Sequence, residues 1–283
     1  MEKNGKTFIK GLVIGATMTV PGVSGGSMAM VLGIYDRLLK HVSEITKYPK
    51  ESLTFLLWFA AGAGSGAFLF SRGISWLLTT RAEGILCFFF LGAVSGGIPM
   101  ILKSASVSRI RGREMICILT GILTALLIAL IPQGIFAPGT ENTPMHLLFQ
   151  LAGGFIIAVA LVLPGISASQ MLYMLGIYES TLKAISSLDI LALLPLAVGG
   201  ILGTYLTARI LEQLIKKHRE ATFLMILGFM LASLPELLPG HLAQENLLFC
   251  VMALAAGFIG VYFVIIICQP NILAHIPGIL NGL

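Results

Sequence analysis

Long apolar runs separated by short polar segments make up most of the chain. A helix needs roughly 17 to 25 predominantly apolar residues to cross a lipid bilayer. Runs of about that size lie at Leu53 to Leu78, Gly84 to Leu102, Met115 to Ile131, Ile190 to Leu211, Ala221 to Leu238 and Leu247 to Ile267. The pattern therefore predicts an all-α, polytopic membrane protein in which these runs are full transmembrane helices.

Two further apolar segments are interrupted by a Pro-Gly pair, at Pro21-Gly22 and at Pro164-Gly165. Such a break frees backbone polar groups, and a membrane protein tolerates it only where those groups face protein or water. The arms beside the first break, Leu12 to Val20 and Ser27 to Leu38, hold about a dozen residues or fewer, which at 1.5 Å per residue reaches about halfway through the hydrocarbon. We therefore expect two re-entrant helical hairpins with their tips near the membrane midplane.

The two interrupted segments are copies of each other. At an offset of 143, positions 20–36 and 163–179 share eight identities in seventeen, and they read VPGVSGGS…GIYD and LPGISASQ…GIYE. Interrupted helices in corresponding places of two halves mark the substrate site in many transporters. The sequence predicts two membrane repeats of one hairpin and three transmembrane helices each, residues 1–145 with a hairpin at about 8–38 and residues 146–283 with a hairpin at about 147–180.

The repeat continues into the first full crossing of each half. Gly62-x-x-x-Gly66 is echoed by Gly199-x-x-x-Gly203, and Arg72 is echoed by Arg209. Small residues at this spacing let two helix backbones approach closely. We expect these glycines to be packing sites rather than ligands.

Loop charges predict the orientation of the helices. Lys and Arg collect in the N-terminal segment and in Arg37 to Lys50, Lys103 to Arg113 and Arg209 to Arg219, whereas Pro132 to Met145 and Glu236 to Asn246 contain none. The positive-inside rule makes the basic segments cytoplasmic and the other two external. Hairpin one then opens to the cytoplasm, hairpin two opens to the outside, both termini are cytoplasmic, and the halves are inverted repeats.

Composition supports this class and excludes others. Hydrophobic residues form 57 % of the 283 and charged residues 11 %, against about 25 % charged residues in soluble domains. The mean hydropathy is +0.94. Because the basic residues that give the net charge of +5 lie in short loops, no nucleic-acid surface is expected. The four cysteines stand singly, without metal-ligand spacing, so neither a metal nor another cofactor is expected.

The hairpin tips have the chemistry of an anion site. After each Pro-Gly turn a helix begins, and its first amides have no intrahelical partner. Ser24 and Ser167 are placed to cap these helices or to donate hydroxyls, and Gly25 and Gly26 leave room for a phosphate. The candidate phosphate-binding residues are Ser24, Gly25, Gly26, Ser27, Ser167, Ala168, Ser169, Gln170, Arg72 and Arg209, with Pro21, Gly22, Pro164 and Gly165 as turn residues.

The charged residues near the hairpins allow more than one interpretation. Arg72 and Arg209 fit bidentate phosphate binding at opposite interfaces, and equally well snorkelling to lipid headgroups. Asp36 and Glu179 end the matching GIY motifs, where they suit pairing with these arginines, coupling to an ion, or a place at the interface. Tyr35 and Tyr178 are expected to be interfacial anchors, and weaker candidates are Lys10, Lys183, His41 and Glu236.

The paired PGxSGG…GIYD and PGxSxS…GIYE segments, on an all-helical chain of this size, resemble the bacterial polyprenyl-phosphate translocases over almost the full length. The resemblance implies a lipid transporter rather than an enzyme, with a polyprenyl phosphate and the bilayer as partners. It implies that undecaprenyl phosphate returns from the outer to the inner leaflet of the cytoplasmic membrane for cell-envelope synthesis. The second copy departs from the first, since Ala168-Ser169-Gln170 replaces Gly25-Gly26-Ser27.

Two alternatives remain at this point. Polyprenyl-diphosphate phosphatases also carry PGxS, but they have an Arg where Gly25 and Ala168 stand here, and neither hairpin interior contains the acidic residue that hydrolysis needs. A secondary transporter of a small organic anion shares every architectural feature, and a lateral opening to lipid would argue against it. Association of the chain with further copies of itself is left open.

Overall fold

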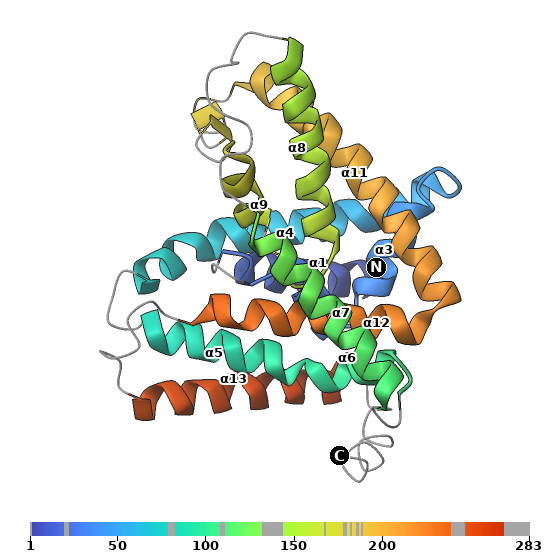
Figure 1. Cartoon of the computed structure of the whole chain (residues 1–283). Helices are drawn as coiled ribbons and strands as arrows, with labels where there is room; N and C mark the ends of the chain where they lie inside the picture. Colours follow the sequence, from blue (N-terminus) through green and yellow to red (C-terminus); the bar gives the residue numbers. More distant parts are fainter. Residues whose placement is uncertain are drawn as a thin grey trace.

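The computed structural model describes residues 2–19, 23–78, 83–107, 111–131, 144–166, 168–177, 180–181, 183–184, 187, 189–238 and 247–268. Every regular element in this part of the chain is helical (Figure 1). The elements are α1 (Glu2–Thr17), α2 (Gly25–Val31), α3 (Tyr35–Ser43), α4 (Pro49–Leu78), α5 (Glu83–Gly96), α6 (Ile98–Ser104), α7 (Gly112–Ala129), α8 (Pro144–Val162), α9 (Ala168–Leu175), α11 (Ile190–Lys217), α12 (Arg219–Ser233), the 3-10 helix η1 (Leu234–Leu237) and α13 (Leu247–Cys268).

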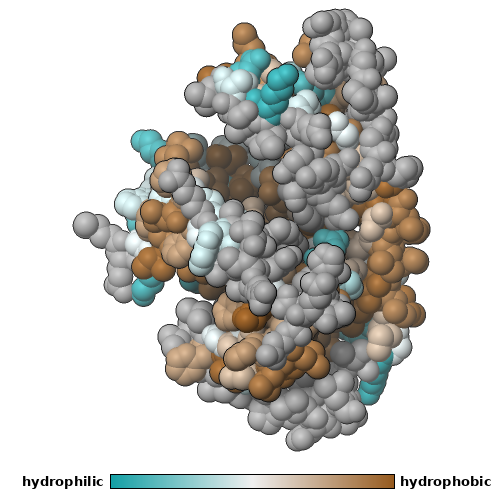
Figure 2. Space-filling view, turned by 90° about the vertical axis from the view of Figure 1, so that its left-hand side faces the viewer, coloured by the Kyte–Doolittle hydropathy of each residue, from teal (hydrophilic) through white to brown (hydrophobic). Residues whose placement is uncertain are grey.

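Several of these helices are long and apolar enough to cross a membrane. Within the described residues, the five such spans are Pro49–Ser71, Gly84–Ser104, Gly112–Ala129, Ile190–Lys217 and Arg219–Leu237, and Leu147–Val162 and Leu247–Phe263 are shorter apolar helices. Large apolar side chains lie on the outer surface, with Phe68 80 % and Leu191 82 % exposed, and Figure 2 shows broad apolar areas. An apolar exterior suits lipid, and the expectation of a polytopic all-α membrane protein is confirmed.

The helices pack mainly in pairs. The most extensive contacts join α1 to α4, α8 to α11, α5 to α13 and α7 to α12. The first two pairs each lie within one half of the chain, whereas the last two join the halves. The core therefore draws on both halves, and Ile34 and Ile101 share one buried cluster with Leu224 and Met230.

Glycines let the pairs within each half approach, and they do so at matching positions. A Cβ added to Gly62 on α4 would fall on the carbonyl oxygen of Phe8 on α1. A Cβ added to Gly199 on α11 would fall on the carbonyl oxygen of Leu151 on α8. Only glycine allows the backbones to lie this close. The packing role expected for the GxxxG pairs is confirmed.

The pairs that join the halves show the same correspondence. Gly92 on α5 lies against the carbonyl of Leu254 on α13, and Gly228 on α12 lies against the carbonyl of Ile118 on α7. Gly228 follows Gly92, and Leu254 follows Ile118, by the same number of residues. Each close approach therefore has a counterpart made by the other half.

The helical arms differ from the expectation in two respects. Gly33 has a φ of 63° and Gly176 a φ of 71°, a left-handed conformation that stops a helix at little cost only at glycine. The expected single arm Ser27 to Leu38 is therefore split into α2 and α3. The arm before the second break, α8, is longer than the arms expected beside the first break. Its 19 residues span about 28 Å, because no residue interrupts its apolar run before Pro164.

Two expected crossings also contain a break. The run Gly84 to Leu102 forms α5 and α6, which are separated at Gly97, with a proline at the start of α6. The run Ala221 to Leu238 forms α12 and η1, which also has a proline in its first turn. Proline cannot donate to the preceding turn of an α-helix, so both helices end near it.

The segments rich in Lys and Arg lie at one end of the molecule. In Figure 1 this is the right-hand side, where α3, α6 and the junction of α11 and α12 are found. Arg219 Nε donates to the carbonyl oxygen of Ser104 at 2.7 Å, and the Ser43 hydroxyl donates to the Glu212 carboxylate. Three segments that are far apart in the sequence, each expected to be cytoplasmic, thus lie together.

Candidate functional site

The ends of the two Pro-Gly segments are in contact. A Cβ added to Gly26, the second residue of α2, would lie 3.1 Å from both Cα and N of Pro164. Pro164 belongs to the turn after α8, and its side chain is fully buried. The duplicated motif therefore brings residues of the two halves to one place, as the repeat led us to expect.

The first tip is packed rather than open. The missing side chain of Gly26 makes room for Pro164, whereas a Cβ on Gly25 would meet the flexible side chain of Met18 at 2.6 Å from Sδ. Ser24 occupies the N-cap position of α2, but its hydroxyl makes no capping hydrogen bond. Ser27 is only 2 % exposed. In this conformation Pro164 of the opposite tip fills the space beside Gly26, and the phosphate site expected there stays a prediction.

The second tip turns at a glycine with a special backbone conformation. Gly165 has a φ of +87°, and a Cβ there would lie 2.5 Å from the backbone carbon of Phe229 and 2.6 Å from the backbone nitrogen of Met230 on α12. Any other residue would be strained by both the φ and the contact. Gly165 thus makes the turn and fixes its distance from α12.

Tyr35 joins the two segments by a hydrogen bond. Its hydroxyl donates to the carbonyl oxygen of Val162 at 2.8 Å, and the side chain is 5 % exposed. Val162 is the last residue of α8, so its carbonyl is one of those that a helix end leaves without an intrahelical partner. The expectation that Tyr35 is an interfacial anchor is wrong, since the ring is buried where it satisfies this carbonyl.

Asp36 has a partner that the sequence did not suggest. Its Oδ2 lies 3.6 Å from Nη2 of Arg219, and the guanidinium of Arg219 also lies over the Phe223 ring, 5.1 Å from the centroid. We expected Arg72 or Arg209 to pair with Asp36, but in the folded chain Arg219 at the start of α12 approaches it. A cavity of about 170 Å³ lies between these residues.

Arg209 is exposed on α11, where Nη1 donates to the Tyr205 hydroxyl at 3.3 Å.

His41 lies on α3 with its ring stacked on Phe55, 4.2 Å between centroids. Burial lowers the pKa of His41, and the nearby Arg37 and Lys40 act in the same direction against Glu51 and Glu44. A neutral imidazole at pH 7 makes His41 a poor phosphate ligand.

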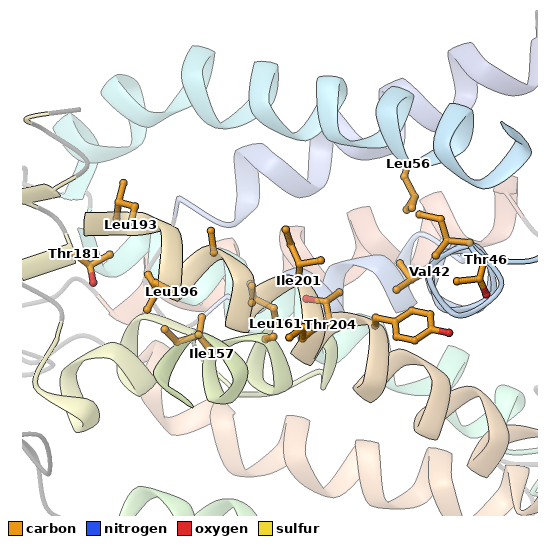
Figure 3. Close-up of a pocket in the computed structure, with 17 residues that line it drawn as sticks. Val42, Thr46, Leu56, Ile157, Leu161, Thr181, Leu193, Leu196, Ile201 and Thr204 are labelled. Atoms are coloured by element: carbon orange, nitrogen blue, oxygen red, sulfur yellow. The ribbon is translucent and has the colours of Figure 1, made fainter. Parts of the chain in front are cut away.

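A long apolar groove runs between the halves, beside the tips. Its volume is about 800 Å³, and Figure 3 shows Val42 and Leu56 of the first half facing Leu161, Leu196 and other residues of the second. Thr181 lies at one end and Thr46 at the other. The stretch of α11 that lines the groove, from Leu193 to Tyr205, is about 18 Å long.

The groove is open on its outer side. Ile201 and Leu202 line it and are 70 % and 49 % exposed. Figure 2 also shows a hollow with an apolar floor on the end of the molecule that lies to the left in Figure 1. An apolar groove with exposed apolar walls suits a hydrocarbon chain, and an anion in water would gain nothing from it.

Comparison with known proteins decides the family. Residues 14–251 match the model of a family described as undecaprenyl phosphate translocase-like. The chain belongs to this family. It is 31 % identical over 252 residues to a polyprenyl-phosphate transporter of Vibrio cholerae, covering 82 % of this chain and 77 % of that one. It is 29 % identical over 264 residues to a polyprenyl-phosphate transporter of Staphylococcus aureus, covering 89 % and 92 %.

No solved structure matches this translocase-like chain significantly. The names of its relatives indicate a transporter rather than an enzyme, and the family resemblance drawn from the paired PGxS motifs is confirmed. With the apolar exterior, membership in this family indicates a multi-pass membrane protein.

Some of the expected site residues of this family member are not placed. Arg72 lies within α4, and Ala168, Ser169 and Gln170 begin α9, but their side chains lie outside the described part of the structure. Wholly outside the described residues are Pro21, Gly22, Ser167, Tyr178 and Glu179. Their roles stay predictions.

Proposed function

We propose that this protein translocates a polyprenyl phosphate from the outer to the inner leaflet of the bacterial cytoplasmic membrane. The substrate would be undecaprenyl phosphate, returned for the synthesis of peptidoglycan and other envelope polymers. The observation that carries the proposal is the apolar groove of about 800 Å³ lined by both halves. A groove of this kind keeps an isoprenoid tail in apolar surroundings while its headgroup moves, and the relatives are named polyprenyl-phosphate transporters.

The two halves are proposed to be inverted repeats, each with a re-entrant hairpin. The matched glycine contacts support the repeat, since Gly62 and Gly199 approach equivalent residues of α1 and α8. The common location of the basic segments supports the inversion, because the positive-inside rule then makes that end cytoplasmic, together with both termini. Hairpin one would open to the cytoplasm and hairpin two to the outside.

The tips are proposed to separate when the headgroup passes. Parting of Gly26 from Pro164 would uncover the first amides of α2, together with the Ser24 hydroxyl, which makes no capping bond. The second tip would contribute through Ser167, Ala168, Ser169 and Gln170, and Arg72 and Arg209 would bind the phosphate at opposite interfaces. Asp36 and Glu179 remain proposed for pairing or ion coupling, with Arg219 as the partner of Asp36.

Reconstitution tests the proposal directly. Proteoliposomes are loaded with a labelled polyprenyl phosphate in one leaflet, and its appearance in the other is measured with an impermeant phosphatase. We expect protein-dependent movement that a long-chain polyprenyl phosphate inhibits and a water-soluble organic phosphate does not. Inhibition by the soluble anion alone would instead favour the organic-anion transporter, and release of phosphate from the lipid by the protein itself would favour the phosphatase-like enzyme.

A further inference from the structure

A second, polar cavity adjoins one end of the groove. Its volume is about 280 Å³, and it shares Thr181, Leu193 and Leu196 with the groove. Its other lining residues are mostly polar, and they include Gln150, Ser180, Lys183, Ser187 and Asp189. Figure 3 shows Thr181 and Leu193 at the end of the groove that leads to this cavity. The two cavities therefore adjoin at these three residues, with the apolar groove on one side of them and the polar cavity on the other.

The charges in the polar cavity favour an anion. Lys183 supplies the cation, and its side chain is exposed. The carboxylate that shares the cavity, Asp189, is already engaged, because Oδ1 accepts a hydrogen bond from the amide of Ala192 at 3.1 Å and caps α11. A carboxylate at a helix N-terminus has its charge partly offset by the helix dipole. Lys183 thus places an ammonium group in the lining of the cavity, where an anionic ligand can reach it.

Gln150 provides a second indication of a polar ligand. Its side-chain oxygen is buried and has no hydrogen-bond partner among the described residues. Buried polar atoms are nearly always paired, so an unpaired one calls for an explanation. Because the two ends of a Gln amide exchange by rotation, this side chain is able either to accept from a phosphate hydroxyl or to donate to a phosphate oxygen.

We propose that the polar cavity binds the phosphate of an isoprenoid monophosphate whose tail lies in the groove. The inference rests on the proposed function and adds the place and direction of binding. Lys183 binds the phosphate oxygens, Gln150 completes the contact, and the tail runs along α11 from Leu193 toward Tyr205. In the proposed topology this end of α11 is external, so the cavity receives the headgroup from the outer leaflet. The sequence alone ranked Lys183 among the weakest candidates.

Binding of defined probes to the purified full-length protein tests this assignment. The probes are a short isoprenyl monophosphate, the corresponding isoprenol and inorganic phosphate. We expect Lys183→Gln to lower the affinity for the monophosphate by about tenfold or more, since a hydrogen bond to a charged group is lost. The affinity for the isoprenol should stay unchanged. Lys183→Arg should restore most of the affinity. Ala197→Phe, which fills the groove, should weaken the binding of both isoprenoids. Lys217→Gln, which alters an exposed lysine that lines neither cavity, should change the binding of neither.

Two outcomes would overturn the proposal. Equal binding of the monophosphate by wild type and Lys183→Gln would exclude the lysine from the site. The cavity would be a site for free phosphate if inorganic phosphate bound as tightly as the isoprenyl monophosphate and if Ala197→Phe did not change its affinity. Lipid movement by wild-type proteoliposomes separates this inference from the function. If the wild type moves lipid between leaflets but Lys183→Gln binds the monophosphate as the wild type does, only the proposed site is refuted. If the binding results are as expected but the wild type moves no lipid, only translocation is refuted.

Discussion

The hydroxyl of Tyr35 and the carbonyl oxygen of Val162 lie 2.8 Å apart, in a hydrogen bond between residues 127 positions apart in the chain. Val162 comes two residues before Pro164, which touches Gly26. Among the described residues, a hydrogen bond and a packing contact thus join the Pro-Gly segments of the two halves. Each of them can be removed separately.

Tyr35→Phe removes the polar contact and leaves the carbonyl of Val162 without its donor. An unsatisfied buried group costs about 1–3 kcal/mol, so the free energy of unfolding in detergent should fall by that amount. Tyr48→Phe is the matched control, because Tyr48 is 59 % exposed, and it should change stability by less than about 0.5 kcal/mol. Equal stability of the two variants in denaturation curves would show that this hydrogen bond does not stabilise the contact between the halves.

Gly26→Val places a branched side chain where Pro164 lies. A Cβ alone would be 3.1 Å from its backbone, so the tips cannot close and transport should be nearly lost, with insertion and expression retained. Gly25→Val should be tolerated better, since its Cβ meets only the Met18 side chain, which has rotamers to move into. Leaflet transfer per inserted protein is the measurement. A Gly26 variant with wild-type transport would show that contact of the tips is dispensable.

Gly62→Ala and Gly199→Ala should destabilise the protein to a similar degree. In each, the new methyl group falls on a carbonyl oxygen of the partner helix, and such overpacking typically costs about 1–3 kcal/mol. Gly64→Ala, on the same helix as Gly62, meets nothing within 4 Å and should be neutral or stabilising by up to about 1 kcal/mol. Thermal unfolding of the three variants would compare them, and a strong effect at only one of the matched sites would argue against equivalent packing.

Arg72 and Arg209 are tested by paired substitutions. If they bind the headgroup, Lys keeps the charge but loses the planar fork, so transport should fall partially, and Gln should nearly abolish it. If they only snorkel, Lys should be tolerated with little loss. The rate is measured with a labelled polyprenyl phosphate in proteoliposomes and normalised to inserted protein. Wild-type transport rates in both Gln variants would show that neither arginine is needed to bind the headgroup.

Cysteine labelling tests the topology. After the native cysteines are replaced by Ala, a single cysteine in Pro132 to Met145 should react with an impermeant reagent from outside the cell. A single cysteine in Lys103 to Arg113 should react only after permeabilisation. Protection of both positions, or reaction of both from outside, would contradict inverted halves.

Much of the fold could be predicted because its causes are local. Length and hydropathy located α4, α7 and α11, and small residues repeated at Gly62 and Gly199 indicated close helix contacts before the partner helices were known. The breaks in the helices were harder to foresee. Gly33 stops a helix only because it adopts a positive φ, and glycine in a sequence is equally compatible with a continued helix.

The site was less predictable because it depends on contacts between distant segments. From its sequence position Tyr35 is expected to lie at the membrane interface, and only the folded structure shows that its hydroxyl meets the carbonyl of Val162. In the sequence Arg219 is one of several basic residues of a loop. Asp36 and Ser104 become its neighbours only because α3, α6 and α12 meet in the fold. Lys183 lies in no recognisable motif, and its interest comes from the groove that ends next to it.

The contact between Gly26 and Pro164 also concerns the electrical properties of the membrane. A bilayer that stores an ion gradient cannot hold a standing aqueous pore, however small. Because a methyl group added to Gly26 would lie only 3.1 Å from the backbone of Pro164, no water molecule fits between these two residues. We expect ions to be excluded between transport events, so that lipid can be returned one molecule at a time without discharging the gradient.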